Sequence, residues 1–402
     1  MRFSDIEEYG FQLWKSAKER KGTPGAPLTI LGKPGIGKSA ATRGIASRIA
    51  DHLARRVLDL VEHPDFSGSV EEFVLFYAAD LSSFLPEDLG GLPRTVERSV
   101  GGHPMLVTDY AAASWLAPFC IPGAVGVLCL DDLPAAAPAV QVAARQMVLD
   151  RRIGQKRLSD GVLVVVTGNR REDKAGATTL PSHFRNVVQL LNLDTDGIAF
   201  EGWQQWYGST GFAPVIPSFL TFRPGRWSMT PADADAKGSY ATPRSWAKLG
   251  EVFGPAKGAG VLREVAAGLV GEGVAVEFLA YLTTRSQLVD PAKVLNDPKG
   301  SVPDPGTILS TPDKMSAMVT GLAEVAGAQA SSKDKELRLT ATVRFVRALG
   351  WVTQSNREFI STGFHTFFAN GGNPSSLVKA VRLNEHDPLI VLCKSFLEKV
   401  FS

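Results

Sequence analysis

The sequence predicts an α/β fold, in which a parallel sheet flanked by helices is followed by helical segments. One observation is that continuous apolar runs alternate with helical patterns up to about residue 195, the order expected of parallel strands that are buried on both faces. The other is that strand patterns disappear from about residue 196, where helical periodicity takes over. We expect an α/β domain at residues 1–195, a helical domain at 196–298 and a helical C-terminal extension at 299–402.

The composition is ordinary for a globular protein, and it narrows the function classes. The 402 residues suffice for two or three domains, and 44% of them are hydrophobic. A formal net charge of +2 indicates no general basic surface, so any contact with nucleic acid would be local. The cysteines (Cys120, Cys129 and Cys393) and the histidines lack metal-ligand spacing, and we expect a reducing, cytoplasmic compartment. We expect neither a signal peptide nor a membrane span, because no apolar run of either type is present.

Each element of the first half follows from a local pattern. Residues 4–20 carry apolar residues at helical spacing and end before a Gly/Pro-rich stretch. After residue 39, apolar residues recur every four positions and predict a second helix. Further helices are expected at 111–116 and 134–149, a loop at 80–94 and a tight basic hairpin within 151–160. Strands are expected at residues 28–31, 73–78, 105–107, 125–130, 161–167 and 187–193.

The second half is expected to be helical. Helical stretches are predicted near residues 243–253, 260–288, 312–329, 360–368 and 389–400. Residues 297–312 are rich in Pro, Gly and Asp and are the best candidate for a linker. For the remaining tail, helical packing on the preceding domain is our main expectation, and a separate binding module is the alternative.

A glycine-rich stretch at residues 32–39, Gly-Lys-Pro-Gly-Ile-Gly-Lys-Ser, lies between the first expected strand and the second helix. Gly35 and Gly37 allow strained dihedrals and a close approach of a ligand to the backbone. The backbone N–H groups of such a loop form an anion site with the N-terminus of the helix that follows. Lys38 would supply charge to the outer phosphates of a nucleotide, and Ser39 an oxygen to Mg²⁺. This pattern is the P-loop, or Walker A motif, and residues 34–40 (Pro34, Gly35, Ile36, Gly37, Lys38, Ser39 and Ala40) are its expected nucleotide-binding residues.

Two other interpretations of this stretch exist. A Gly/Pro-rich turn can meet the pattern by chance, although the order of strand, loop and helix argues against it. Gly35, Gly37 and Ala40 also fit a looser dinucleotide-binding pattern, but that pattern gives no reason for Lys38 and Ser39 together. The helix at 4–20 could cover the adenine ring or serve packing alone.

Polar residues follow two other apolar runs where each strand is expected to end. Asp131 and Asp132 follow 125–130, and Asn169 follows 161–167. Ligands of parallel sheets bind beyond the carboxyl ends of the strands, so these residues can converge with the P-loop. Asp131 could hold Mg²⁺, Asp132 could orient an attacking water, and Asn169 could contact that water or the γ-phosphate. Outside this context, such residues are usually turn or cap residues.

These motifs resemble, in their order, those of the AAA+ ATPases, and the MoxR-like branch is most similar. The segments that carry the resemblance are 32–39, 128–132, 167–169, 180–185 and 242–244, with branch-like stretches at 88–93, 149–154 and 158–162. It is strong over residues 25–195 and weaker to about 290, and it does not place the rest of the chain.

The resemblance implies ATP and Mg²⁺ as ligands and a role for each matching residue. Lys38 and Ser39 would be the Walker A pair, and Asp131 the Walker B metal ligand. Asn169 would be the first sensor, and Arg244, on the helical lid at 196–298, the second. Arg185 resembles the arginine finger that reaches a neighbouring subunit, with Arg170 and Arg171 as rivals, and this implies a ring that is usually hexameric.

One departure from the family pattern concerns Asp132, where the family usually has Glu. The shorter side chain could misplace the water by about an ångström, which can cost roughly 10²-fold in rate. Two loops could do mechanical work: the segment 80–94, with Phe84 and Leu85, and the basic hairpin 151–157. Each could equally be a solvated loop.

Three functions remain open. The leading hypothesis is an ATP-hydrolysing ring that remodels or activates a protein partner, as a chaperone does. The second is a nucleic-acid motor or loader that uses the basic hairpin. The third is a nucleotide-bound structural ring with slow turnover, because of Asp132.

Overall fold

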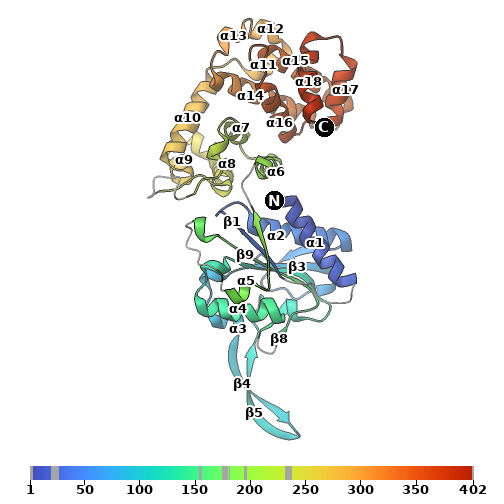
Figure 1. The fold of residues 1–402 in the computed structure, drawn as a ribbon, viewed down its shortest axis with the longest axis vertical. Helices are drawn as coiled ribbons and strands as arrows, with labels where there is room; N and C mark the ends of the chain where they lie inside the picture. The colour runs from blue at the N-terminus through green and yellow to red at the C-terminus, as the bar shows by residue number, and fades with distance from the viewer. Residues whose placement is uncertain are drawn as a thin grey trace. The chain divides into compact units, whose positions relative to one another are not determined.

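The protein is described from a computed structural model, which covers residues 3–19, 27–153, 156–173, 180, 182–193, 197–230 and 238–400. The chain divides into two compact units, Met1–Ala199 and Phe200–Ser402. Each unit is described by itself (Figure 1).

The first unit is built on a parallel sheet. Among the described residues, six strands follow the spatial order β10-β1-β9-β6-β3-β2, and every neighbouring pair is parallel. Five of them match predicted strands: β1 (Leu28–Gly32), β3 (Phe73–Asp80), β6 (Val125–Asp131), β9 (Gly161–Gly168) and β10 (Gln189–Leu193). β2 (Arg56–Asp59) was not predicted, because four residues that begin with Arg and end with Asp form no apolar run.

Both faces of this sheet are buried, which explains the continuous apolar runs. Successive side chains of a strand point to opposite faces. On β9, Leu163 and Val165 belong to the core that includes α1 (Phe3–Glu19) and α2 (Lys38–Leu53). Val162, Val164 and Val166 belong to the core that includes α4 (Pro138–Asp150). The unit therefore has three layers, with helices on both sides of the sheet (Figure 1).

The predicted helices α1, α2 and α4 are confirmed. α1 packs on α2, and the indole N–H of its buried Trp14 donates to Gly161 O at 3.0 Å. The basic hairpin is also confirmed, as β7 (Arg152–Ile153) and β8 (Lys156–Arg157), although its residues 154 and 155 lie outside the described part of the chain. Its charge differs from expectation, because Arg151 is buried and donates to Ser159 O at 2.8 Å and Val162 O at 2.7 Å.

The segment from 80 to 116 differs most from prediction. The expected loop contains α3 (Pro86–Gly90) and the start of β4 (Leu92–Val100), which pairs antiparallel with β5 (His103–Ala111). We call these two strands the β4–β5 ribbon, and it projects from the unit (Figure 1). Gly101 and Gly102, at φ 59° and 87°, form the turn that joins the strands.

The expected helix at 111–116 is wrong. Ala111 is still part of β5, and the helical turn that follows is a short 3₁₀ helix at Ala117–Cys120. Of the two apolar residues at 84 and 85, Phe84 packs against Trp115 with ring centroids 5.9 Å apart, whereas Leu85 is exposed.

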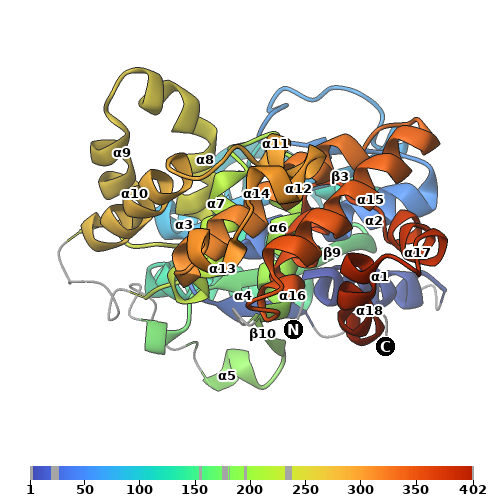
Figure 2. The ribbon, with the colours of Figure 1, turned by 90° about the horizontal axis from the view of Figure 1, so that it is seen from above.

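The second unit is helical. The described helices are α6 (Gly197–Gly208), α7 (Val215–Phe222), α8 (Pro243–Gly258), α9 (Leu262–Val270), α10 (Glu272–Ser286), α11 (Pro291–Asn296), α12 (Pro298–Ser301), α13 (Pro305–Ile308), α14 (Pro312–Ala330), α15 (Lys335–Val352), α16 (Phe359–Ala369), α17 (Pro374–Leu383) and α18 (Pro388–Val400). Within this unit α8, α9 and α10 lie together at one end, and α15, α17 and α18 at the other (Figure 2).

α14 is the central helix of the second unit. It contacts α15, α16, α11, α10 and α7, and most of its residues are buried. The candidate linker at 297–312 contains α12 and α13, and its Val302 and Leu309 belong to the same core as α14. A division between 196–298 and 299–402 stays a prediction.

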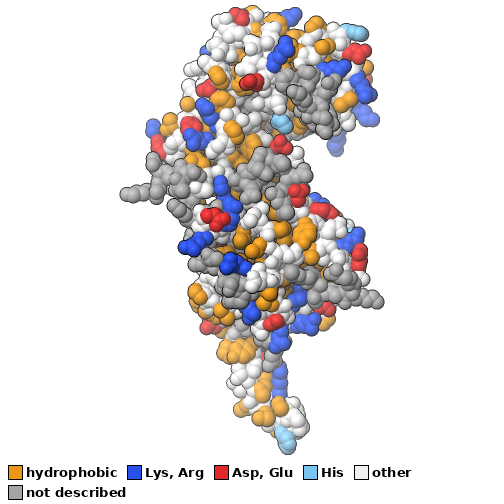
Figure 3. Space-filling view, in the orientation of Figure 1, with side chains coloured by type: hydrophobic (Ala, Val, Ile, Leu, Met, Phe, Trp, Pro, Cys, Tyr) orange, Lys and Arg blue, Asp and Glu red, His pale blue; other side chains and the backbone are white. Residues whose placement is uncertain are grey.

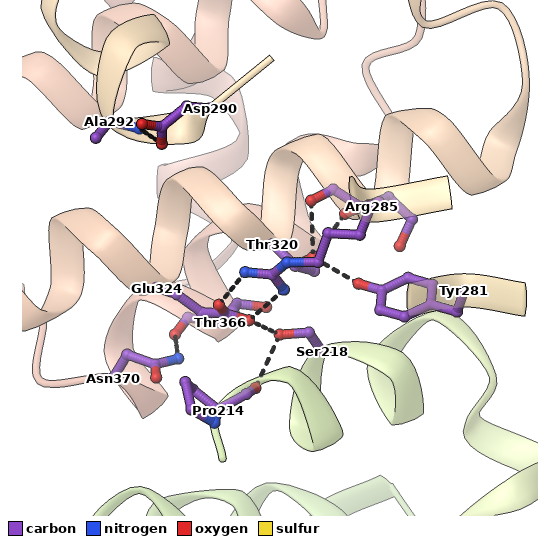
Figure 4. A network of polar contacts seen from close by, with 12 residues as sticks. Pro214, Ser218, Tyr281, Arg285, Asp290, Ala292, Thr320, Glu324, Thr366 and Asn370 are labelled. Atoms are coloured by element: carbon purple, nitrogen blue, oxygen red, sulfur yellow. Dashed lines mark hydrogen bonds and ion pairs between the residues drawn. The ribbon is translucent and has the colours of Figure 1, made fainter. Parts of the chain in front are cut away.

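A buried polar network joins the helices α7, α10 and α14 of this unit (Figure 4). Glu324 of α14 is 7% exposed and accepts from Arg285 Nη1 of α10 at 2.9 Å. Glu324 also accepts from Ser218 of α7, and Tyr281 of α10 lies 3.0 Å from the Thr320 hydroxyl. Burying a carboxylate requires such partners, because an uncompensated charge is costly in the interior.

The predicted fold class, a parallel sheet flanked by helices and followed by helical segments, is confirmed. In the part of the chain that the structure describes, no helix combines the length and apolar character that crossing a membrane requires.

Candidate functional site

The order of the strands brings the predicted motifs to one edge of the sheet. β9 lies between β1 and β6, and all three run in the same direction. The glycine-rich loop follows the carboxyl end of β1, Asn169 follows that of β9, and the Asp131–Asp132 pair stands at that of β6. Residues that are far apart in the sequence thus meet where ligands of parallel sheets usually bind.

The glycine-rich loop has the backbone shape that its sequence predicts. Gly35 and Gly37 have φ of 71° and 95°, in the left-handed region that only glycine enters without cost. Gly32 is needed for close packing, because a Cβ there would lie 2.6 Å from Leu193 O. Gly37 is also the N-cap of α2 and offers no side-chain acceptor to the first N–H groups of the helix. These N–H groups and the helix dipole favour an anion at this position.

Lys38 is held inside the loop. Its side chain is 6% exposed, and Nζ donates to Gly32 O at 3.1 Å and to Lys33 O at 3.0 Å. It also donates to Asn169 Oδ1 at 2.8 Å. An ammonium that is withdrawn from water and aimed across the loop is a strong electrostatic partner for phosphate.

Ser39 and Asp131 meet directly. Ser39 Oγ donates to Asp131 Oδ2 at 2.6 Å. The other carboxylate oxygen, Oδ1, accepts from the Thr167 hydroxyl and from the Asp132 backbone N–H at 3.1 Å. Both carboxylate oxygens of Asp131 are therefore fixed by donors from three elements.

Asp132 lies at a turn with a left-handed backbone, at φ 51° and ψ 34°. Its side-chain Oδ1 accepts from Asn169 Nδ2 at 3.3 Å. Asn169 thus connects a donor and an acceptor, since its amide oxygen faces Lys38 and its amide nitrogen faces Asp132. Gly168, just before it, allows β9 to approach the next turn, because a Cβ there would lie 2.2 Å from Pro134 Cδ.

The donor set fits a nucleotide with Mg²⁺. A serine hydroxyl and one carboxylate are hard oxygen ligands, and Mg²⁺ is typically held by one or two carboxylates together with substrate phosphates. Among the described residues, no group of three or more His, Cys, Asp or Glu side chains could hold a metal by itself. Ser39 and Asp131 would hold the ion, and the metal would neutralise phosphate charge.

The predicted arginines belong to other elements than this cluster. Arg185 is exposed at the end of α5 (Ser182–Arg185), and its rival Arg171 is also exposed. Arg170 is mostly buried and lies 3.7 Å from Glu172. Arg244 is exposed in the first turn of α8, in the second unit, where Thr242 and Ser245 form a capping box. Within the first unit the structure brings together Lys38, Ser39, Asp131, Asp132 and Asn169, and Arg185 is not part of this hydrogen-bonded cluster. Arg244 belongs to the second unit.

Two neighbours of Asp131 had no predicted role at the site. Thr167 was part of a motif and Cys129 was interpreted as a core residue, yet the Thr167 hydroxyl contacts both Asp131 and the Cys129 thiol. The sequence alone does not show these contacts, because they depend on β6 and β9 being neighbouring strands in this register.

Comparison with known proteins finds only weak structural likenesses. No protein-family model and no curated protein matches the chain. A RuvB mutant from Thermotoga maritima aligns at 13% identity over 83% of this chain and 91% of that chain, with a TM-score of 0.35. PCH-2 from C. elegans aligns at 13% identity over 71% of this chain and 62% of that chain, with a TM-score of 0.29.

DnaA from Aquifex aeolicus, with AMPPCP bound, aligns at 12% identity over 97% of this chain and 92% of that chain, with a TM-score of 0.30. All three TM-scores lie below 0.5, so these likenesses carry no functional argument for this chain.

Proposed function

We propose that this chain is an AAA+ ATPase of the MoxR-like type, which binds ATP with Mg²⁺, hydrolyses ATP and works as a ring on a protein partner. The observation that carries the proposal is the convergence of Lys38, Ser39, Asp131 and Asn169 at one edge of the sheet. This constellation supplies a cation, a hydroxyl, a carboxylate and an amide, which are the groups that phosphoryl transfer requires for positioning and charge stabilisation.

Each residue has a separate task in this proposal. The loop N–H groups and Lys38 bind the β- and γ-phosphates, and Ser39 and Asp131 hold the metal. Asp132 accepts a proton from the attacking water or orients it, and Asn169, which donates to Asp132, keeps that carboxylate beside the γ-phosphate. Removal of a general base typically costs about 10²–10⁴ in rate.

We propose a ring, usually of six copies, in which the exposed Arg185 reaches a pocket that a neighbouring protomer completes. Arg244 is the proposed second sensor, and residues 196–298 the proposed lid. The free cysteines are compatible with a reducing, cytoplasmic location.

The β4–β5 ribbon favours a protein partner. Its formal charges cancel, with Arg94 and Arg98 opposed by Glu97 and Asp109. Its exposed apolar side chains (Figure 3) are Leu92, Val100, Met105, Leu106 and Tyr110, and Leu106 is 75% exposed. A neutral, apolar surface suits a polypeptide better than a phosphate backbone, which binds chiefly through cations.

The basic hairpin offers less support for a nucleic-acid partner than its sequence predicts. Arg151 is buried and donates to two backbone carbonyl groups, so it braces the hairpin from inside and is withdrawn from a phosphate at the surface. Arg157 lies 3.5 Å from Asp160, which further reduces the exposed positive charge. Arg152 and Lys156 remain for such a contact.

Phosphate release with Mg²⁺ and ATP tests the proposal. Wild-type protein should release phosphate, and Lys38→Ala and Asp132→Asn should each lower the rate by at least about 10²-fold. Lys248→Ala, a change of the same kind at an exposed lysine of the second unit, should leave the rate unchanged. Turnover that survives both site changes would remove the site assignment.

Two additions to the same assay separate the alternatives. Stimulation by single-stranded DNA, with affinity that falls steeply with salt, would favour the motor or loader. Nucleotide-dependent assembly with phosphate release near background would favour the structural ring.

A further inference from the structure

Thr167 is placed where the carboxylate of Asp131 must be oriented. β6 and β9 are parallel neighbours in which Leu130 pairs with Val166, so the next residues, Asp131 and Thr167, lie side by side. Thr167 is fully buried, and its hydroxyl contacts Asp131 Oδ1. The hydroxyl lies on the opposite side of the carboxylate from Ser39, which contacts Oδ2 at 2.6 Å.

The direction of these hydrogen bonds is fixed by chemistry. An ionised carboxylate can only accept, so the Thr167 O–H donates to Asp131. The Thr167 oxygen can then accept, and the Cys129 Sγ lies 3.8 Å away. The contacts therefore run from Cys129 through Thr167 to Asp131.

We propose that Thr167 is the positioning residue that turns the Asp131 carboxylate toward Mg²⁺. Thr167 and the Asp132 N–H hold Oδ1, so Oδ2 points to Ser39, with which it would hold Mg²⁺. This inference rests on the proposed function, because it assigns a partner to its metal ligand. Residues that hold a metal ligand in place typically contribute about 10–100-fold to metal affinity.

The substitution Thr167→Val isolates the hydroxyl. Valine keeps the branched shape that suits a buried strand, but it leaves Oδ1 without one donor. Thr167→Ser restores the hydroxyl without the methyl group. Thr29→Val is the matched control, because Thr29 is fully buried in β1 of the same sheet and its hydroxyl has no partner among the described residues.

The test measures the affinity for a fluorescent, non-hydrolysable ATP analogue at increasing Mg²⁺ concentrations. The quantity compared between variants is the Mg²⁺ concentration at which half of the increase in affinity is reached. Thr167→Val should raise this concentration by about 10–100-fold. Thr167→Ser and Thr29→Val should stay within about threefold of wild type. Affinity for the analogue in EDTA should be unchanged in all variants, because Thr167 does not face the phosphates in this account.

The outcomes separate this inference from the proposed function. If wild-type protein binds the analogue with Mg²⁺ dependence and Thr167→Val has the same half-saturation, Thr167 has no positioning role and the inference alone is overturned. If wild-type protein shows no Mg²⁺-dependent binding, both fail. Should Thr167→Val not fold, Thr167→Cys, with a weakly donating thiol, is judged by the same shift.

Discussion

Asp132 combines a proposed catalytic carboxylate with a backbone that most residues avoid. At φ 51° it lies in the left-handed region, which Asp and Asn enter more easily than longer or branched side chains. The turn is fixed by its surroundings, since Leu133 and Pro134 are buried and Ala135 N donates to Asp132 O at 2.9 Å. The backbone conformation thus offers a reason for Asp at position 132, where the family that the motifs resemble usually has Glu.

A stability series at position 132 tests this reason. Asp132→Gly should be more stable than Asp132→Ala by about 1 kcal/mol, because glycine enters the left-handed region without the Cβ cost. Asp132→Asn should stay close to wild type, since Asn tolerates this conformation. Urea unfolding measures the three free energies. Equal stability of the Gly and Ala variants would show that the turn relaxes when the carboxylate is removed.

At the scale of elements, the strands and loops that could be predicted were those whose sequence pattern has a single structural explanation. β1, β3, β6 and β9 are buried on both faces, so their apolar runs indicated strands directly. The glycine-rich loop was recognisable because phosphate binding restricts both backbone and side chains.

Other elements depend on contacts that no local pattern shows. The β4–β5 ribbon is exposed on nearly all positions, so neither strand has the alternation that a buried face imposes. The role of Thr167 depends on the register of β9 against β6. The network around Glu324 joins residues more than 100 positions apart, such as Ser218 and Glu324.

That network predicts a large loss of stability when its carboxylate is removed. Glu324→Ala should destabilise the protein by about 3–5 kcal/mol, because Arg285 would remain in the interior without its partner. Glu251→Ala is the matched control, since Glu251 is half exposed and pairs with Lys248 on the surface of α8. That change should cost less than about 1 kcal/mol. Thermal or urea unfolding measures both, and equal small losses would contradict the structural role of the pair.

Shortening the β4–β5 ribbon should have little effect on stability, because the ribbon contributes little to the core. Replacing residues 99–104 with Gly-Gly removes the exposed tip of the ribbon and keeps the ion pair between Arg98 and the buried Asp109. Nucleotide affinity should stay within about twofold and the melting temperature within a few degrees, since surface changes rarely cost more than about 0.5 kcal/mol. A fall in nucleotide affinity of tenfold or more would show that the ribbon supports the site.

At the scale of the whole molecule, the proposed arginine finger requires a pocket that neighbouring copies share. Arg185→Ala should leave nucleotide affinity unchanged and lower phosphate release by about 10³–10⁵-fold, the range of an arginine finger. Arg171 is a second exposed arginine and a rival for this role, so Arg171→Ala is the matched control and should keep most of the activity. Reversed results would transfer the role to Arg171.

Mixing provides the check on whether the arginine acts between protomers. Lys38→Ala copies keep Arg185, and Arg185→Ala copies keep the loop, so mixed assemblies should regain part of the activity. Activity that stays at the level of the two inactive variants would argue against sharing.

The central claim is that one edge of the sheet binds a nucleoside triphosphate through Lys38. Equilibrium titration of a fluorescent ATP analogue with Mg²⁺ tests it most directly. Wild-type protein should saturate at one nucleotide per chain, and Lys38→Ala should bind roughly tenfold to hundredfold more weakly, because hydrogen bonds to charged groups contribute about 1.5–3 kcal/mol. A wild-type protein that binds no analogue, or a Lys38→Ala variant that binds it equally well, would contradict the account.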